Sequence, residues 1–186
     1  FYSKICSTHT YGERLQTVKN VKQAGLSTCS GGIVGMGESD SDFVELAFSL
    51  RKLKVDSIPV NFLHPVDGTP LENQPSFNAI RGLNALCLMR FLNPSSEIRM
   101  AAGRELYLGT SSGLAFYPVN SIFVEGYLTT PGEKTFAAQQ LIEEAGFEVE
   151  NSKPVRKTSA KPSSPLFPSL DTIRDWENSG PTQKRL

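Results

Sequence analysis

Three apolar segments of this chain each contain one polar residue at a comparable depth, namely Cys29, Asn61 and Arg99. Each segment is predicted to be a strand, in which side chains alternate between two faces. Ser57 and Ser121 fall on the same faces, so the five side chains converge if those faces point into one barrel. A buried arginine is costly unless it is paired or bound to an anion, and a thiolate or an anionic inorganic cluster would offset that cost. The pattern indicates a polar site inside a barrel.

Each of these residues also has a purely structural interpretation. An isolated cysteine is commonly a small buried hydrophobic side chain, and Cys87, within an apolar helical segment, is expected in the core. Arg99 is expected to pair with Glu97 or Glu105 at the end of the sheet. Asn61 is equally compatible with capping a loop. The residues by themselves leave both interpretations open.

A glycine-rich turn follows the first strand, in Cys29-Ser-Gly-Gly-Ile-Val-Gly-Met-Gly-Glu38. Its glycine spacing is not that of the dinucleotide-binding fingerprint, and it lacks the lysine of a phosphate-binding loop. It predicts only a sharp turn or a close backbone approach at the end of a strand. His9 and His64 have no second metal ligand at a useful spacing, so no zinc site is predicted.

Length and composition exclude several classes of protein. The 186 residues, 39% of them hydrophobic, suffice for one core but not for two large domains. A formal net charge of zero gives no electrostatic reason to expect nucleic acid or an anionic membrane as a partner. No apolar run approaches the roughly 18–20 residues of a membrane span, and no signal peptide is visible. Three cysteines without tight spacing argue against a disulfide scaffold and predict a cytoplasmic protein.

Residues 1–150 alternate between predicted helices and strands. Strands are expected over 27–34, 57–63, 97–101 and 120–124, and helices after Thr10, after Ser39, over 77–92, over 111–117 and from Pro131 to Gly146. Capping boxes are expected at Thr10–Glu13 and Thr130–Glu133, and Ser39 with Asp42 is expected to cap the second helix. This order predicts an α/β fold with a parallel sheet. The sheet is either small and open or about the C-terminal half, four βα units, of a TIM-type (β/α)8 barrel.

Residues 151–186 change character. They are rich in proline and serine, carry more basic than acidic residues, and are predicted to be a disordered tail. Within them, 170–176 has the composition of a single helical turn.

Six blocks of residues 1–150 resemble biotin synthase, in the order and spacing of the C-terminal half of that enzyme. The blocks are Tyr11-Gly-Glu-Arg14, Cys29-Ser-Gly-Gly-Ile-Val-Gly-Met-Gly-Glu38, Ile58-Pro-Val-Asn61 with Gly68-Thr-Pro-Leu71, Ile98-Arg-Met-Ala-Ala-Gly-Arg-Glu105, Asn120-Ser-Ile-Phe123 and Leu128-Thr-Thr-Pro131.

The resemblance implies a radical S-adenosylmethionine enzyme on a (β/α)8 barrel. In this family a 4Fe–4S cluster reductively cleaves S-adenosylmethionine to a 5′-deoxyadenosyl radical, which abstracts hydrogen from unactivated carbons of dethiobiotin. A 2Fe–2S cluster is the proposed sulfur donor for the ring of biotin. The resemblance also implies an electron donor such as flavodoxin or ferredoxin and a homodimer in full-length form.

Residue roles follow from the same resemblance. Cys29 and Arg99 match ligands of the 2Fe–2S cluster, and Asn61 matches a contact to the ureido ring of dethiobiotin. Ser57 and Ser121 match positions around that cluster. The positions that match the S-adenosylmethionine site are Arg14, Ile33, Phe62 and His64. No residue of the chain matches a catalytic acid, base or nucleophile.

The chain also departs from the family. It lacks the Cys-x3-Cys-x2-Cys motif of the 4Fe–4S cluster, two further thiolate ligands of the second cluster and an upstream motif that binds S-adenosylmethionine. We therefore expect a fragment of a longer enzyme that is inactive alone. Pro118-Val119 replaces a usual Gly-Ala pair, and Glu125 stands where glycine is common.

Two other functions are compatible with the residues. One is a related radical enzyme on the same barrel, of the hydrogenase-maturation or amino-acid mutase type, although such relatives do not need the pair Cys29 and Arg99. The other is a truncated homologue that serves as a binding or scaffold protein, which the missing motifs and the polar tail favour.

Overall fold

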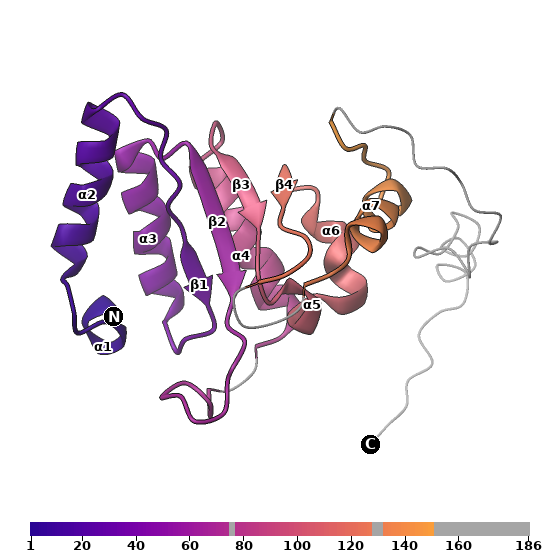
Figure 1. Cartoon of the computed structure of the whole chain (residues 1–186), viewed down its shortest axis with the longest axis horizontal. Coiled ribbons are helices and arrows are strands. Elements are labelled where there is room, and N and C mark those ends of the chain that lie inside the picture. Colours follow the sequence, from indigo (N-terminus) through magenta and orange to yellow (C-terminus); the bar gives the residue numbers. More distant parts are fainter. Residues whose placement is uncertain (75–76, 128–131, 151–186) are drawn as a thin grey trace, which may run out of the picture. The chain divides into compact units, whose positions relative to one another are not determined.

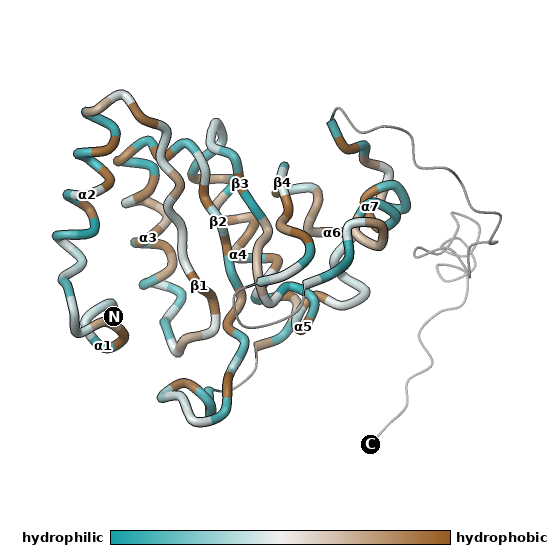
Figure 2. The backbone as a smooth tube through the Cα atoms, viewed as in Figure 1, coloured by the Kyte–Doolittle hydropathy of each residue, from teal (hydrophilic) through white to brown (hydrophobic). Residues whose placement is uncertain are grey.

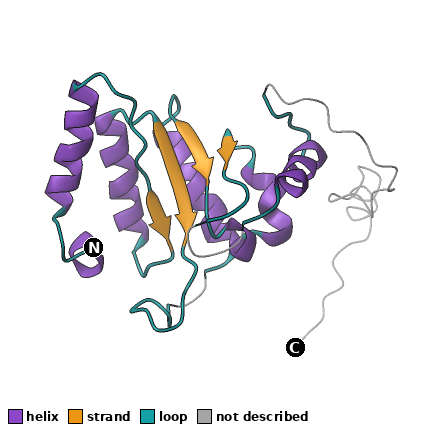
Figure 3. Ribbon diagram, viewed as in Figure 1, coloured by secondary structure: helices purple, strands orange, loops and turns teal. Residues whose placement is uncertain are grey.

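Four parallel strands and the helices between them form the framework of the chain (Figures 1 and 3). The computed structural model describes residues 1–74, 77–127 and 132–150. The strands are β1 (Gly32–Val34), β2 (Ser57–Phe62), β3 (Glu97–Met100) and β4 (Ser121–Ile122). The helices are α1 (Tyr2–Ile5), α2 (Tyr11–Gln23), α3 (Asp40–Leu53), α4 (Ala79–Leu92), α5 (Arg104–Tyr107), the 3₁₀ helix η1 (Gly109–Ser111), α6 (Ser112–Ala115) and α7 (Thr135–Glu144). Among these described helices, none is both long and apolar enough to cross a lipid bilayer.

The strands pair in sequence order, β1-β2-β3-β4, and every pair is parallel. The predicted α/β fold with a parallel sheet is therefore confirmed. The local signals at two helix starts are confirmed as well. Complete capping boxes join Thr10 to Glu13 before α2 and Ser39 to Asp42 before α3.

Two predicted boundaries are wrong by four residues or more. The first strand was expected over 27–34, but only Gly32–Val34 forms β1, and Cys29 makes an isolated bridge to Ser57. The cause is Pro59, which has no backbone N–H to continue the ladder between that bridge and β1. The last helix begins at Thr135 with Lys134 as its N-cap, four residues later than expected. Thr130 and Pro131 lie outside the described residues, as does the whole of 151–186.

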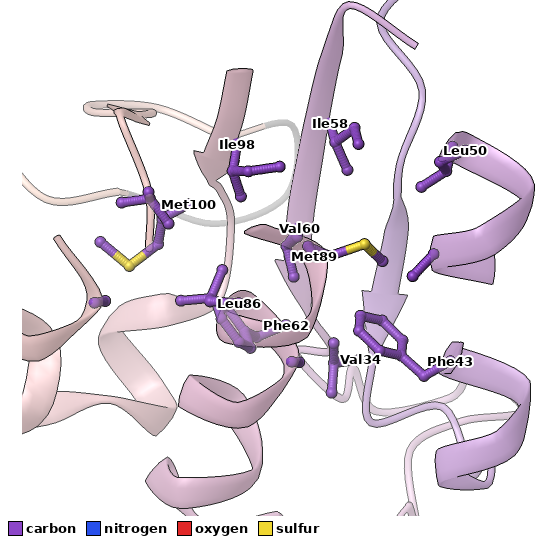
Figure 4. Packing of buried hydrophobic residues seen from close by; sticks show 14 of the residues in the cluster. Val34, Phe43, Leu50, Ile58, Val60, Phe62, Leu86, Met89, Ile98 and Met100 are labelled. Atoms are coloured by element: carbon purple, nitrogen blue, oxygen red, sulfur yellow. The ribbon is translucent and has the colours of Figure 1, made fainter. Parts of the chain in front are cut away.

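One face of the sheet is buried by helices. Its strand residues alternate inward and pack against α3 and α4, as the close-up in Figure 4 shows. The core includes Val34, Phe43, Leu50, Ile58, Val60, Phe62, Leu86, Met89, Ile98 and Met100, all less than 9% exposed. Figure 2 shows hydrophobic and hydrophilic positions following one another along β2 and β3. Because one set of side chains is buried here, the other set must lie on the opposite face.

The placement of Cys87 in the core is wrong. Helix α4 carries apolar residues on more than one side, but only the face with Leu86 and Met89 contacts the sheet. Each residue turns about 100° around a helix axis, which carries the Cys87 side chain away from that face. Cys87 is therefore exposed, on the same side of α4 as Phe91, which is 83% exposed.

A glycine turns the chain directly after β3. Gly103 has φ 83°, and a Cβ built on it would lie 2.0 Å from the carbonyl oxygen of Phe62. The next residue, Arg104, is only 1% exposed and pairs with Glu133 (Nη1 to Oε2, 2.9 Å) and Glu105 (Nη2 to Oε1, 3.5 Å). These contacts hold the segment after β4 against the segment after β3.

We predict that Gly103→Ala destabilises the protein far more than Gly25→Ala. Both glycines have positive φ, which costs any other residue about 1 kcal/mol, but only Gly103 would also press its Cβ into backbone. Urea denaturation should give a loss of about 1 kcal/mol for Gly25→Ala and about 2–4 kcal/mol for Gly103→Ala. Equal losses would contradict the close approach of Gly103 to β2.

Candidate functional site

The polar strand residues share the face of the sheet opposite the core. The register places Cys29, Ser57 and Glu97 in one row across the strands, and Arg99 and Ser121 in the next. Asn61 lies opposite Ile33 of β1, one row further toward the C-terminal ends. In Figure 1, α4 lies behind the strands and no described helix lies in front of β2. The sequence therefore predicted correctly that these residues share a face.

Cys29 is exposed on this face, not buried inside a strand as expected. Its place is fixed by the preceding residue, because the backbone N–H and the hydroxyl of Thr28 both donate to Oδ2 of Asp56 at 2.8 Å. Lys22 of α2 reaches the same carboxylate at 3.0 Å. These hydrogen bonds, first that from the Thr28 backbone N–H, lower the pKa of Asp56 to about 2. An ionised carboxylate thus anchors the segment that carries the thiol.

Arg99 pairs with Glu97 two residues earlier on the same face. Its Nη2 donates to Oε2 of Glu97 at 2.7 Å, and its Cζ lies 5.7 Å from the ring centre of Phe123. The Arg99 hydrogen bond holds the pKa of Glu97 below its usual range. Glu105 instead accepts a hydrogen bond from the hydroxyl of Tyr127 at 3.0 Å and pairs with Arg104. The structural interpretation with Glu97 is confirmed, and that with Glu105 is wrong.

Two polar atoms on this face are buried and lack a hydrogen bond within the described residues: Nε of Arg99 and Oγ of Ser57. Ser57 is 8% exposed and lies directly opposite Glu97 in the register. The hydroxyls of Ser57 and Ser121 both help to lower the pKa of Glu97, although Oγ of Ser57 makes no hydrogen bond within the described residues. Buried polar atoms without partners are rare, and here they mark a place that suits a polar or charged group.

Asn61 caps the residues that follow β3. Its Oδ1 accepts a hydrogen bond from the backbone N–H of Ala102 at 3.3 Å, which confirms the loop-capping interpretation. The amide nitrogen, at the other end of the side chain, carries two N–H donors. One side chain can therefore both fix the loop and offer donors on the open face.

The residues that resemble an S-adenosylmethionine site are not all brought together. Ile33 is 38% exposed on the open face, opposite Asn61. His64 is exposed directly after β2, and Arg14 is exposed on α2. Phe62 is 2% exposed and points the other way, into the core, where its ring packs near Phe77. Strand alternation is the reason, since Phe62 follows Asn61.

The sequence missed Glu38 as the residue that shapes the glycine turn. Its buried carboxylate accepts the backbone N–H groups of Gly35 (2.9 Å) and Met36 (2.7 Å), and Arg81 of α4 donates to its carbonyl at 2.9 Å. A cavity of about 820 Å³ lies beside this turn, between the starts of α3 and α4. An acidic residue directly after the glycines and before the Ser39 cap was the available signal.

Among the described residues, no three His, Cys, Asp or Glu side chains gather as a metal site.

Comparisons with known proteins show which family the chain resembles. Residues 59–148 match the family model of the Biotin and Thiamin Synthesis associated domain. The chain is 53% identical over 146 residues to biotin synthase of Bacillus pumilus, covering 78% of this chain and 44% of that protein. It is 50% identical over 151 residues to biotin synthase of Rhodopirellula baltica, covering 81% and 42%. The chain belongs to the biotin synthase family. It spans less than half the length of these biotin synthases and corresponds to their C-terminal half.

A solved structure supports the fold alone. The crystal structure of methylornithine synthase (PylB) superposes with a TM-score of 0.64 at 17% identity, covering 84% of this chain and 49% of that one. The predicted membership of the biotin synthase family is confirmed by the sequence relatives.

We predict that the anchor of Cys29 weakens in acid. The pKa of Asp56 is lower in the folded chain (about 2) than its ordinary 3.8, so its contribution to stability is complete above pH 3.8 and is lost as the pH falls through 2. Urea midpoints should fall over this window for the wild type. Asp56→Asn should be less stable than the wild type at pH 5 and should approach the wild type near pH 2. The control is Asp67→Asn, in an exposed loop, whose urea midpoint should change with pH in parallel with that of the wild type. If the difference in urea midpoint between the wild type and Asp56→Asn stayed constant from pH 5 to pH 2, the anchoring role of Asp56 would be refuted.

Proposed function

We propose that this chain is the part of a biotin synthase that binds dethiobiotin and one iron–sulfur cluster, in an enzyme that inserts sulfur into dethiobiotin by S-adenosylmethionine-derived radical chemistry. The observation that carries the proposal is the thiol of Cys29 and the guanidinium of Arg99 on one open face, in a chain of this family. The activity, the substrate and the partners are those of a longer protein than the chain described.

The residues of the open face suit a 2Fe–2S cluster. Cys29 offers a thiolate, and Arg99 offers a nitrogen beside a buried Nε that has no partner among the described residues. The register and ordinary sheet spacings put the two Cα atoms about 12 Å apart, so the side chains project from the same face on either side of β2. When bound, the cluster supplies the sulfur atom. Ser57 of β2 lies opposite Glu97, and Ser121 of β4 lies opposite Arg99, so the two serines lie on either side of β3.

Asn61 would orient the substrate. The ureido ring of dethiobiotin has a carbonyl oxygen that accepts hydrogen bonds, and the amide nitrogen of Asn61 donates them. Because Oδ1 of Asn61 already accepts from Ala102, the side chain is fixed before the substrate binds. We assign Ile33, His64 and Arg14 to the S-adenosylmethionine site, with Phe62 supporting that site from the core side.

The open face requires a cover. We propose that the four strands are half of a (β/α)8 barrel, and that the other half supplies the 4Fe–4S ligands, further 2Fe–2S thiolates and closure of β1 and β4. Closure excludes water from the radical chemistry, which the chain alone cannot do. The isolated chain is therefore inactive. The complete enzyme is a cytoplasmic homodimer that receives electrons from a donor of the flavodoxin or ferredoxin type.

The test uses the complete polypeptide, reconstituted anaerobically with iron and sulfide. We predict that Cys29→Ala loses the visible 2Fe–2S absorption and the matching iron, retains the 4Fe–4S absorption, and forms no biotin. The reason is the loss of a thiolate ligand that no other described side chain on this face replaces.

Cys87→Ala is the matched control, because Cys87 is an exposed thiol on the outer face of α4. It should leave both absorption signatures and the turnover unchanged. Unchanged spectra in Cys29→Ala would reduce this thiol to a surface residue and would refute the proposal.

A further inference from the structure

The guanidinium of Arg99 is held by Glu97, which precedes it by two residues on the same face of β3. Nη2 of Arg99 donates a hydrogen bond to Oε2 of Glu97 at 2.7 Å. Among the described residues, Glu97 is the acidic partner of this guanidinium, so the contact restricts where the guanidinium can lie.

Glu97 itself starts in the row of Cys29. Glu97 is in register with Ser57, and Ser57 is in register with Cys29, so all three belong to one row across the sheet. Arg99 starts one row further on, opposite Pro59 and Ser121. Without the contact to Glu97, a four-bond side chain has many rotamers that point away from Cys29.

The remaining neighbours limit the guanidinium in other directions. The ring of Phe123, from the segment after β4, lies 5.7 Å from Cζ, a distance suited to a cation–π contact. The Arg99 and Glu97 side chains are 32% and 36% exposed, so the charge attraction between them is partly screened by water. The pair consequently contributes more to orientation than to stability.

We propose that Glu97 is a positioning residue for Arg99, and that its hydrogen bond holds the guanidinium in the orientation that faces the iron–sulfur cluster. This inference rests on the proposed role of Arg99. Glu97 itself does not contact the cluster. Its length and its acceptor oxygen, rather than its negative charge, are what the arrangement requires.

Two conservative variants separate position from charge. Glu97→Gln keeps the length and an acceptor oxygen but removes the charge, whereas Glu97→Asp keeps the charge and shortens the side chain by one methylene. Positioning predicts that Gln behaves like the wild type and that Asp behaves like Glu97→Ala. If Glu97 served only to neutralise the charge of Arg99, Glu97→Asp would behave like the wild type and Glu97→Gln would behave like Glu97→Ala.

The experiment is ⁵⁷Fe Mössbauer spectroscopy of the complete polypeptide, reconstituted anaerobically, because the quadrupole splitting of each iron reports its ligands. Wild type and Arg99→Ala establish the two reference spectra of the 2Fe–2S cluster. We expect Glu97→Ala and Glu97→Asp to move to the Arg99→Ala spectrum, and Glu97→Gln to keep the wild-type spectrum. Glu45→Ala, which removes an exposed carboxylate of α3, should also keep the wild-type spectrum.

The outcomes separate the two claims. If wild type and Arg99→Ala give the same spectrum, the role of Arg99 is refuted and the inference about Glu97 falls with it. If they differ but Glu97→Asp keeps the wild-type spectrum, or Glu97→Gln loses it, the role of Arg99 stands and positioning by Glu97 is refuted. Far-ultraviolet circular dichroism checks the folding of each variant. If Glu97→Ala does not fold, the Gln and Asp variants still decide the question.

Discussion

Burial of one sheet face against α3 and α4 determines where every polar strand residue lies. Ile58, Val60 and Phe62 of β2 occupy the core, so strict alternation sends Ser57 and Asn61 to the other side. The same holds for Ile98 and Met100 on β3, which leave Glu97 and Arg99 on the open face. A shift of one residue in the register would bury an arginine and expose an isoleucine, at a cost of several kcal/mol. The site is thus a consequence of the core.

The glutamates and arginines of the chain illustrate two uses of an ion pair. Arg104 is almost fully buried and has two carboxylates, Glu133 and Glu105, which keep the loops after β3 and β4 together. Arg99 is half-buried and has one carboxylate, Glu97, and among the described residues the Nε atoms of both arginines are buried without a hydrogen bond. The first arrangement satisfies its charge internally and is structural. The second leaves hydrogen-bonding capacity facing the open side, as a site that receives a ligand requires.

Local signals and periodicity predicted most of the fold. The Thr10 and Ser39 capping boxes, the order of helices and strands, and the shared face of Cys29, Asn61 and Arg99 all follow from short-range patterns. The predictions that were wrong concern features that depend on tertiary context. Composition cannot show that Pro59 interrupts pairing beside Gly31, nor that α4 presents Cys87 to solvent. Glu125 is a partial exception: the resemblance led us to expect glycine at this position, and Glu125 adopts φ 66°, a conformation that favours glycine.

The central claim is that the open face is the interior of a closed barrel in the complete protein, with Cys29 inside it and Cys87 outside. The most direct test is the rate of alkylation of each thiol by iodoacetamide, resolved by mass spectrometry, in metal-free protein. The account predicts that Cys29 reacts readily in the 186-residue chain and much more slowly in the complete polypeptide, while Cys87 reacts at similar rates in both. Equal reactivity of Cys29 in the two proteins would contradict the account.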